Sequence, residues 1–169
     1  MNSPFVYDNH VTGQNFVGRK TDALVLSNLL EAGENVCIYE TPRAGKTSLI
    51  QQTLYNMRAS GKQFIVAYVD MLNVRSRRMF LKKLGGAVLR AAYSTPSDYA
   101  AVIEKHLAGT HFVFDPAQFA TKEDIVCMNW DADENDVYMM ASLPQKIAQE
   151  KGMPVYVVFK EFQNVMQTP

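Results

Sequence analysis

The chain has 169 residues, of which 47% are hydrophobic and 20% are charged, as in an ordinary globular domain with a sizeable core. Its 17 basic side chains balance 17 acidic ones, so net charge gives no reason to expect a nucleic acid or a membrane as partner. No apolar run has the length of a transmembrane helix, and the first residues lack the features of a signal peptide. Two cysteines, Cys37 and Cys127, lie in apolar stretches without metal-site spacing, which predicts reduced core residues of a cytoplasmic protein.

The N-terminal part predicts an irregular extension, then one helix and one strand. Residues 1–19 are rich in turn-forming residues and end in a Gly-Arg pair, and we expect them to precede a domain that covers the rest of the chain. Thr21 or Asp22 can cap the following helix, which Gly33 ends. The apolar run at 35–40 predicts a short strand.

The middle of the chain continues with a helix, a strand and a second helix. Apolar residues recur at helical spacing over 46–59, and Gly61 ends that pattern. The continuous apolar run at 64–69 predicts a buried parallel strand. A further helix is expected over 76–93.

Four further elements complete the alternation. They are a helix at 98–107, a short strand at 110–115, a helix at 135–151 and a last apolar strand at 155–159. Residues 116–136 are expected to be mostly loop, and Pro144 is expected to break its helix. Strands that alternate with helices predict an α/β fold with a parallel sheet.

The segment Ala44-Gly45-Lys46-Thr47-Ser48 has the pattern of a phosphate-binding loop. It follows the apolar run of the first strand and opens a helix, which is the context that such a loop requires. Backbone N–H groups of the turn and of the helix N-terminus bind phosphate oxygens. In this chemistry Lys46 reaches the β- and γ-phosphates, and the Thr47 hydroxyl is a ligand of Mg²⁺.

The loop departs from the pattern at its first position. The motif G-x-x-x-x-G-K-[ST] places glycine five residues before Gly45, where this chain has Glu40. The alternative interpretation is a strand–turn–helix in which Gly45 serves only as a turn residue.

Three blocks of sequence together resemble a known family. They are Phe16-Val17-Gly18-Arg19, the loop Pro42-Arg43-Ala44-Gly45-Lys46-Thr47-Ser48-Leu49, and Glu161-Phe162-Gln163 after the last apolar strand. These blocks are similar to the archaeal-type ATPases of the AAA+/STAND P-loop superfamily, including their bacterial relatives, in which the last strand typically ends Asp-Glu-Phe-Gln. Weaker likeness at 4–7 and 143–148 spreads the resemblance in scattered blocks over almost the whole chain.

The resemblance implies roles for individual residues. Lys46 and Glu161 take the catalytic positions, with Glu161 as the general base that polarises water. Gly18 and Arg19 are implied to lie near the adenine side of the site. The phosphate-binding residues, for an ATP ligand, are implied to be Thr41, Pro42, Arg43, Ala44, Gly45, Lys46, Thr47 and Ser48, with Thr47 also holding Mg²⁺.

The end of the last strand departs from the family pattern as well. Lys160 stands at the position of the metal-binding aspartate, a degenerate Walker B motif. An ammonium group cannot be a ligand of Mg²⁺, and its charge opposes the metal, so Mg²⁺ binding is in doubt and hydrolysis is expected to be impaired. Lys160 either neutralises Glu40, which would make the two changes a coupled pair, or contacts phosphate directly; a plain surface lysine is the third possibility.

The implied fold is a three-layer P-loop sandwich with sheet order 5-1-4-3-2. The 169 residues provide its first three strands only. We therefore expect an incomplete domain over residues 20–169, without the last two core strands and the helical lid. Unpaired sheet edges would then favour association with a protein partner or with a second copy.

The function predicted from these features is ATP binding with impaired hydrolysis. The alternative is a protein-interaction module without catalytic activity, a degenerate remnant of the ATPase fold. Lys160 favours the remnant, whereas the intact Gly45-Lys46-Thr47 favours retained nucleotide binding.

Three other features are interpreted as structural. The basic cluster of Arg75, Arg77, Arg78, Lys82 and Lys83 is interpreted as the solvated side of a helix, so a nucleic acid is not the expected partner. The acidic stretch 131–136 lacks the glycine and glutamate of a calcium loop and is interpreted as leading into a helix. The histidines show no metal-site spacing and are interpreted as ordinary polar or half-buried residues; they are His10, His106 and His111.

Overall fold

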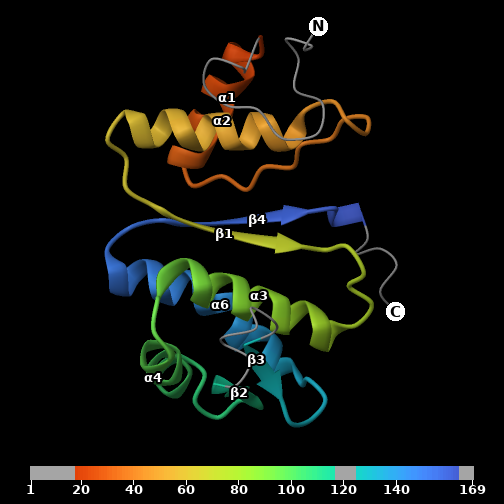
Figure 1. Cartoon of the computed structure of the whole chain (residues 1–169), viewed down its shortest axis with the longest axis vertical. Helices are drawn as coiled ribbons and strands as arrows, with labels where there is room; N and C mark the ends of the chain where they lie inside the picture. The colour runs from red at the N-terminus through yellow and green to blue at the C-terminus, as the bar shows by residue number, and fades with distance from the viewer. Residues whose placement is uncertain (1–17, 117–124, 164–169) are drawn as a thin grey trace, which may run out of the picture. The chain divides into compact units, whose positions relative to one another are not determined.

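The computed structural model describes residues 18–116 and 125–163 (Figure 1). Contacts within the chain divide it after Gln63 into a first unit, Met1–Gln63, and a second unit, Phe64–Pro169. The described residues contain helices and a parallel sheet, which confirms the predicted α/β class. The full three-layer P-loop sandwich stays a prediction.

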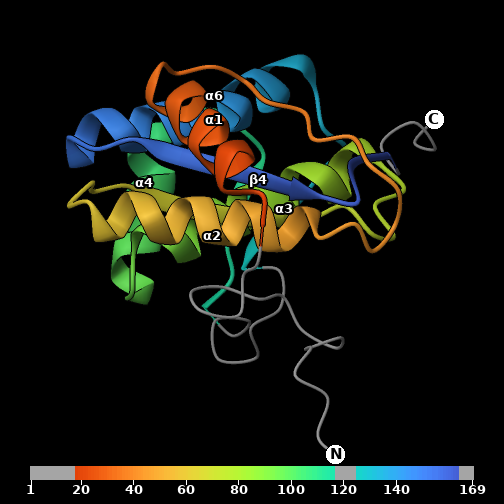
Figure 2. The same cartoon turned by 90° about the horizontal axis from the view of Figure 1, so that it is seen from above.

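The first unit is built on two helices, α1 (Lys20–Glu31) and α2 (Lys46–Ala59), which pack together around a small apolar cluster (Figure 2). The buried members of this cluster are Ala23, Leu26 and Leu49. The fully buried Thr53 hydroxyl donates to the backbone oxygen of Leu49 over 2.9 Å, which satisfies a polar group inside the contact. The predicted helix at 46–59 is thus confirmed.

The start of α1 differs from the prediction. The capping residue is Arg19, in the left-handed conformation with φ of 52°, and not Thr21 or Asp22. The Asp22 carboxylate accepts a hydrogen bond from Arg19 Nε over 2.8 Å, so it binds a side chain and does not cap the helix backbone.

The strand predicted at 35–40 is wrong. Residues 34–41 form no strand, and they lead from α1 to the turn before α2 as an irregular segment (Figure 1). Ile38 packs against the cluster between the helices, whereas Cys37 and Tyr39 are exposed, so the interpretation of Cys37 as a core residue is also wrong. A strand exists only when its backbone groups pair with a neighbour. Among the described residues, those at 34–41 pair with no strand.

The second unit contains the predicted parallel pair, β1 (Ile65–Asp70) and β4 (Val155–Lys160). The register runs from Ile65 opposite Val155 to Asp70 opposite Lys160. One face of this sheet packs against α3 (Arg77–Ala92) and α6 (Glu134–Lys151) (Figure 1). The strands therefore end side by side at Asp70 and Lys160.

The helix α6 runs unbroken through Pro144, so the predicted break is wrong. A proline inside a helix loses one backbone hydrogen bond. Around it, Met140, Leu143 and Ile147 are fully buried, and their packing holds the helix together despite the lost bond. The close approach of α3 depends on Gly85, because a Cβ there would lie 2.7 Å from the Met140 methyl group.

The rest of the second unit is α4 (Pro96–His106) and a separate antiparallel pair, β2 (Phe112–Phe114) and β3 (Val126–Met128). The strand β2 confirms the prediction. The strand β3 lies in a region predicted to be mostly loop, and Val126 in it is fully buried in the same core as β1 and α3. Three residues are too few for a visible strand pattern.

Glu150, near the end of α6, joins the ends of three helices. Its carboxylate accepts hydrogen bonds from Lys105 Nζ over 2.7 Å and from the Tyr93 hydroxyl over 3.0 Å, and it lies 2.8 Å from His106 Nε2. These hydrogen bonds, with that of Lys105 as the largest cause, lower the pKa of Glu150 from 4.5 to about 2. Tyr93 follows α3, and the other two partners end α4, so one carboxylate connects the three elements.

We predict that Glu150→Gln lowers the free energy of unfolding by about 1 kcal/mol at pH 7, since several charged or polar partners lose their acceptor. The folded pKa lies below the unfolded value, so this stability is present above pH 4.5 and is lost as pH falls toward 2. Urea unfolding of both proteins at several pH values measures the difference.

The control is Glu134→Gln, which removes an ion pair with Arg77 whose glutamate side chain is 86% exposed. We expect it to change stability by less than about 0.5 kcal/mol. An equal effect of the two variants, or a difference that persists at pH 2, would contradict this role of Glu150.

Candidate functional site

The predicted phosphate loop is a turn that leads directly into α2. The helix begins at Lys46, and its capping residue, Gly45, has a φ of 80° and makes no side-chain capping bond. Arg43 is also left-handed, with a φ of 63°, and the Ala44 N–H donates to the Thr41 carbonyl over 3.3 Å. The positive φ values at Arg43 and Gly45 place a tight turn directly before the N-terminus of α2, a position at which backbone N–H groups can bind an anion.

The Lys46 side chain folds back over the start of the loop. Its Nζ donates to the backbone oxygens of Glu40 and Thr41, over 2.9 Å and 3.0 Å. The ammonium group is therefore held within the loop, next to the N-terminus of α2. A positive charge and a helix N-terminus at one place attract an anion.

Arg19 contacts the same loop from outside the motif. Its Nη1 donates to the Glu40 carboxylate over 2.9 Å and to the Ala44 carbonyl over 3.0 Å. Its Nε binds Asp22 over 2.8 Å, and these carboxylates raise the pKa of Arg19, with the Asp22 hydrogen bond as the largest cause. The structure thus brings Arg19 to the phosphate loop; its implied place near adenine stays a prediction.

The other predicted loop residues lie on the surface of the turn. Thr41, Pro42, Arg43 and Thr47 are exposed, whereas Ala44, Gly45 and Ser48 are partly buried. The Thr47 side chain is thus accessible at the second position of α2, and its role as a Mg²⁺ ligand stays a prediction. Gly18, with a φ of 79°, immediately precedes Arg19.

Lys160 is the last residue of β4 and Glu161 follows it, and both belong to the second unit. The Lys160 Nζ lies 5.1 Å from the centre of the Tyr68 ring on β1, a distance at which a cation and an aromatic face attract each other. Glu161 is left-handed, with a φ of 54°, and its carboxylate accepts a hydrogen bond from Gln163 over 2.6 Å. The carboxylate proposed as general base thus has a partner of its own, as Glu40 has in Arg19.

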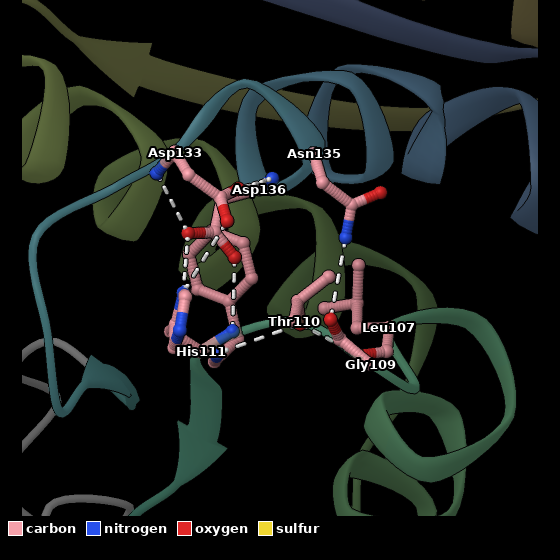
Figure 3. Close-up of polar contacts among 8 residues, drawn as sticks. Leu107, Gly109, Thr110, His111, Asp133, Asn135 and Asp136 are labelled. Carbon is pink, nitrogen blue, oxygen red and sulfur yellow. Dashed lines mark hydrogen bonds and ion pairs between the residues drawn. The ribbon is translucent and has the colours of Figure 1, made fainter.

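The sequence interpretation missed a cluster of His111, Asp133 and Asp136, which Figure 3 shows between β2 and the start of α6. In the part of the chain that the structure describes, these three residues form a group whose potential metal-ligating atoms lie within 4.8 Å of one another. His111 and Asp136 are 25 residues apart, which is why no local spacing pattern revealed them. The local pattern that could have been noticed is Asp-x-x-Asp at a helix start, a capping signal.

Hydrogen bonds already engage both oxygens of the fully buried Asp136 carboxylate (Figure 3). One oxygen accepts from the His111 backbone N–H over 2.9 Å; the other accepts from the Asp133 N–H over 3.0 Å and lies 2.9 Å from His111 Nδ1. Burial raises the pKa of Asp136, but the bonds from His111 and Asp133 outweigh it and leave that pKa lowered. A metal ion bound to both His111 Nδ1 and Asp136 would have to replace the hydrogen bond between them, so we assign this cluster to capping α6 and joining it to β2.

Most of the basic cluster at the start of α3 is held in contacts within the second unit. Arg77 pairs with Glu134 over 2.7 Å, and Arg78 donates to the Met128 carbonyl. Lys83 donates to the Asp70 carbonyl at the end of β1 over 2.9 Å. These contacts support the interpretation of the cluster as structural.

Comparisons with protein-family models, with curated proteins and with solved structures gave no match to this chain. The family thus stays a prediction that depends on the loop and on the short motifs around it. Within the described ranges, 18–116 and 125–163, none of the helices combines the length and the apolarity needed to cross a membrane.

We predict that stability falls as pH rises above 6.5 because His111 then loses its charge. The hydrogen bond with Asp136 raises the pKa of His111 above 6.5, so the stability it contributes is complete below that pH and is lost as pH rises through the folded pKa. Urea unfolding between pH 5.5 and pH 8.5 measures the slope, which should flatten in His111→Gln. Glu134→Gln, on the first turn of the same helix, should keep the wild-type slope; an unchanged slope in His111→Gln would contradict the prediction.

Proposed function

We propose that the chain binds a nucleoside triphosphate, ATP by the family resemblance, through residues 40–47 and the N-terminus of α2. The observation that carries this proposal is the loop itself. It joins two left-handed residues, a helix start without a side-chain cap, and a lysine whose ammonium lies over the loop. A polyphosphate is typically bound by N–H groups of a loop and of a helix N-terminus together with a positive charge.

The proposed role of each group follows from its position. The N–H groups around Ala44 and Gly45 bind phosphate oxygens, and Lys46 exchanges two carbonyl partners for the phosphates. The exposed Thr47 hydroxyl is the group that would hold Mg²⁺, which supplies charge neutralisation between the phosphates. If Gly45 serves only as a turn residue, the Lys46 side chain does no more than satisfy the carbonyls of Glu40 and Thr41, and the affinity measurement below separates the two interpretations.

Hydrolysis is proposed to be weak or absent. The ammonium of Lys160 lies on the Tyr68 ring where the family pattern has a metal-binding carboxylate, and a positive charge there opposes Mg²⁺. The residues at this strand end do not fit a Mg²⁺ ion, and we assign no metal-dependent role to them. The proposed activity is therefore nucleotide binding without appreciable hydrolysis.

We expect Lys46→Ala to weaken ATP binding by about tenfold to a hundredfold, the loss typical of a charge-assisted hydrogen bond. Isothermal titration calorimetry of the full chain, with and without Mg²⁺, measures the affinity. The comparison with and without Mg²⁺ tests whether Thr47 holds the metal.

The matched control is Lys62→Ala, in the same unit. Lys62 pairs with Glu31 over 2.9 Å, and its removal takes away the same charge without touching the loop. Equal affinities of wild type and Lys46→Ala, or equal losses in both lysine variants, would reject the phosphate site.

A second candidate function, a protein-interaction module, is favoured by exposed apolar side chains on α1. Leu24 is 62% exposed and Val25 is 51% exposed, although both lie on a helix that packs through Ala23 and Leu26. Exposed apolar residues side by side are typical of contact surfaces. A folded chain that binds no nucleotide in the calorimetry would favour this function.

A further inference from the structure

The acidic residue at the first loop position does not force the backbone into strain. Glycine is needed where φ is positive. Among the described residues, the non-glycine residues with positive φ are Arg19, Arg43, Asn73 and Glu161, and Glu40 is not one of them. The backbone at 40 therefore accepts a side chain, and the departure from the motif calls for an explanation in terms of the carboxylate.

That carboxylate binds Arg19, and Arg19 binds the other end of the loop. One guanidinium nitrogen, Nη1, donates both to Glu40 Oε2 over 2.9 Å and to the Ala44 carbonyl over 3.0 Å. Asp22 holds the Nε of the same guanidinium over 2.8 Å, so the group is fixed in orientation from α1. The rigid plane of an arginine side chain suits such a bridge better than a lysine.

Lys46 stabilises the loop by donating hydrogen bonds to the carbonyls of Glu40 and Thr41. A bound phosphate attracts the Lys46 ammonium, so these two hydrogen bonds are lost when the ligand binds. The bridge from Arg19 involves other atoms, the Glu40 carboxylate and the Ala44 carbonyl, so it stays in place when Lys46 moves.

We propose that Arg19 and Glu40 form a latch that holds the phosphate loop in its binding conformation while Lys46 engages the ligand. Arg19 is a positioning residue in this proposal and does not contact the phosphates. Glu40 replaces the missing glycine by a specific contact. This inference rests on the proposed phosphate-binding function and explains how the site keeps its shape with a side chain at its first position.

The sharpest test is Glu40→Gly, which restores the glycine of the motif. A latch predicts that this change weakens binding of inorganic tripolyphosphate about twofold to fivefold, because an ion pair that holds the loop is lost. If Glu40 is only a departure from the motif, the Glu40→Gly variant should bind tripolyphosphate as tightly as wild type or more tightly. Calorimetry with tripolyphosphate on the full chain separates the two, since this probe has no base or ribose.

A double-mutant cycle then assigns the effect to the pair. Arg19→Gln and Glu40→Gln should each weaken tripolyphosphate binding by a similar factor, and the double variant should be no weaker than either. Glu31→Gln removes an ion pair of the same length from the same unit and should leave the affinity unchanged. Additive losses in the double variant, or a Glu40→Gly variant that binds as well as wild type, overturn the latch.

The latch and the proposed function fail in different ways. If wild type binds tripolyphosphate no better than Lys46→Ala does, the proposed function is wrong, and amide hydrogen exchange of residues 40–48 then decides on the latch. Equal and non-additive acceleration of exchange in Arg19→Gln and Glu40→Gln supports it. Exchange as slow as in wild type overturns it.

Discussion

Backbone polar groups need partners, and this requirement explains which parts of the chain become regular. The strands β1 and β4 pair along their whole length, from Ile65 opposite Val155 to Asp70 opposite Lys160. The apolar segment at 35–40 has no neighbouring strand among the described residues of the first unit and forms none. In the predicted phosphate loop that follows, side chains satisfy the carbonyls. Lys46 binds those of Glu40 and Thr41, and Arg19 binds that of Ala44.

Local patterns predicted the elements whose partners lie close in the sequence or whose apolar runs are long. The helix α2 and the strands β1 and β4 are examples, because spacing and apolar runs determine them directly. The errors arose at segments whose conformation depends on contacts with residues distant in the sequence. The strand at 35–40 lacked a neighbour, packing around Met140 and Leu143 overrode Pro144, and β3 was too short to give a pattern.

The residues of the candidate site likewise divide into those that the motif indicates and those that only the fold brings together. The motif indicated Gly45, Lys46 and Thr47 as candidate residues, since the chemistry of phosphate binding determines their spacing. It could not reveal the bond between Arg19 and Glu40, which are 21 residues apart, or the bond between His111 and Asp136. By the motif alone Glu40 is a departure from the pattern, whereas its contacts make it the ion-pair partner of Arg19. Both buried and exposed ion pairs of this kind depend on the fold and leave no local pattern.

The central claim is that the loop in front of α2 binds phosphate, and chemical-shift mapping of the ¹⁵N-labelled full chain with ATP tests it most directly. The backbone N–H groups of a phosphate-binding loop are themselves the ligands, so their signals report the contact without a mutation. We predict that the largest changes occur at Ala44, Gly45, Lys46 and Thr47, and that tripolyphosphate reproduces them. Changes confined to the second unit, or no change in a folded chain, would contradict the account.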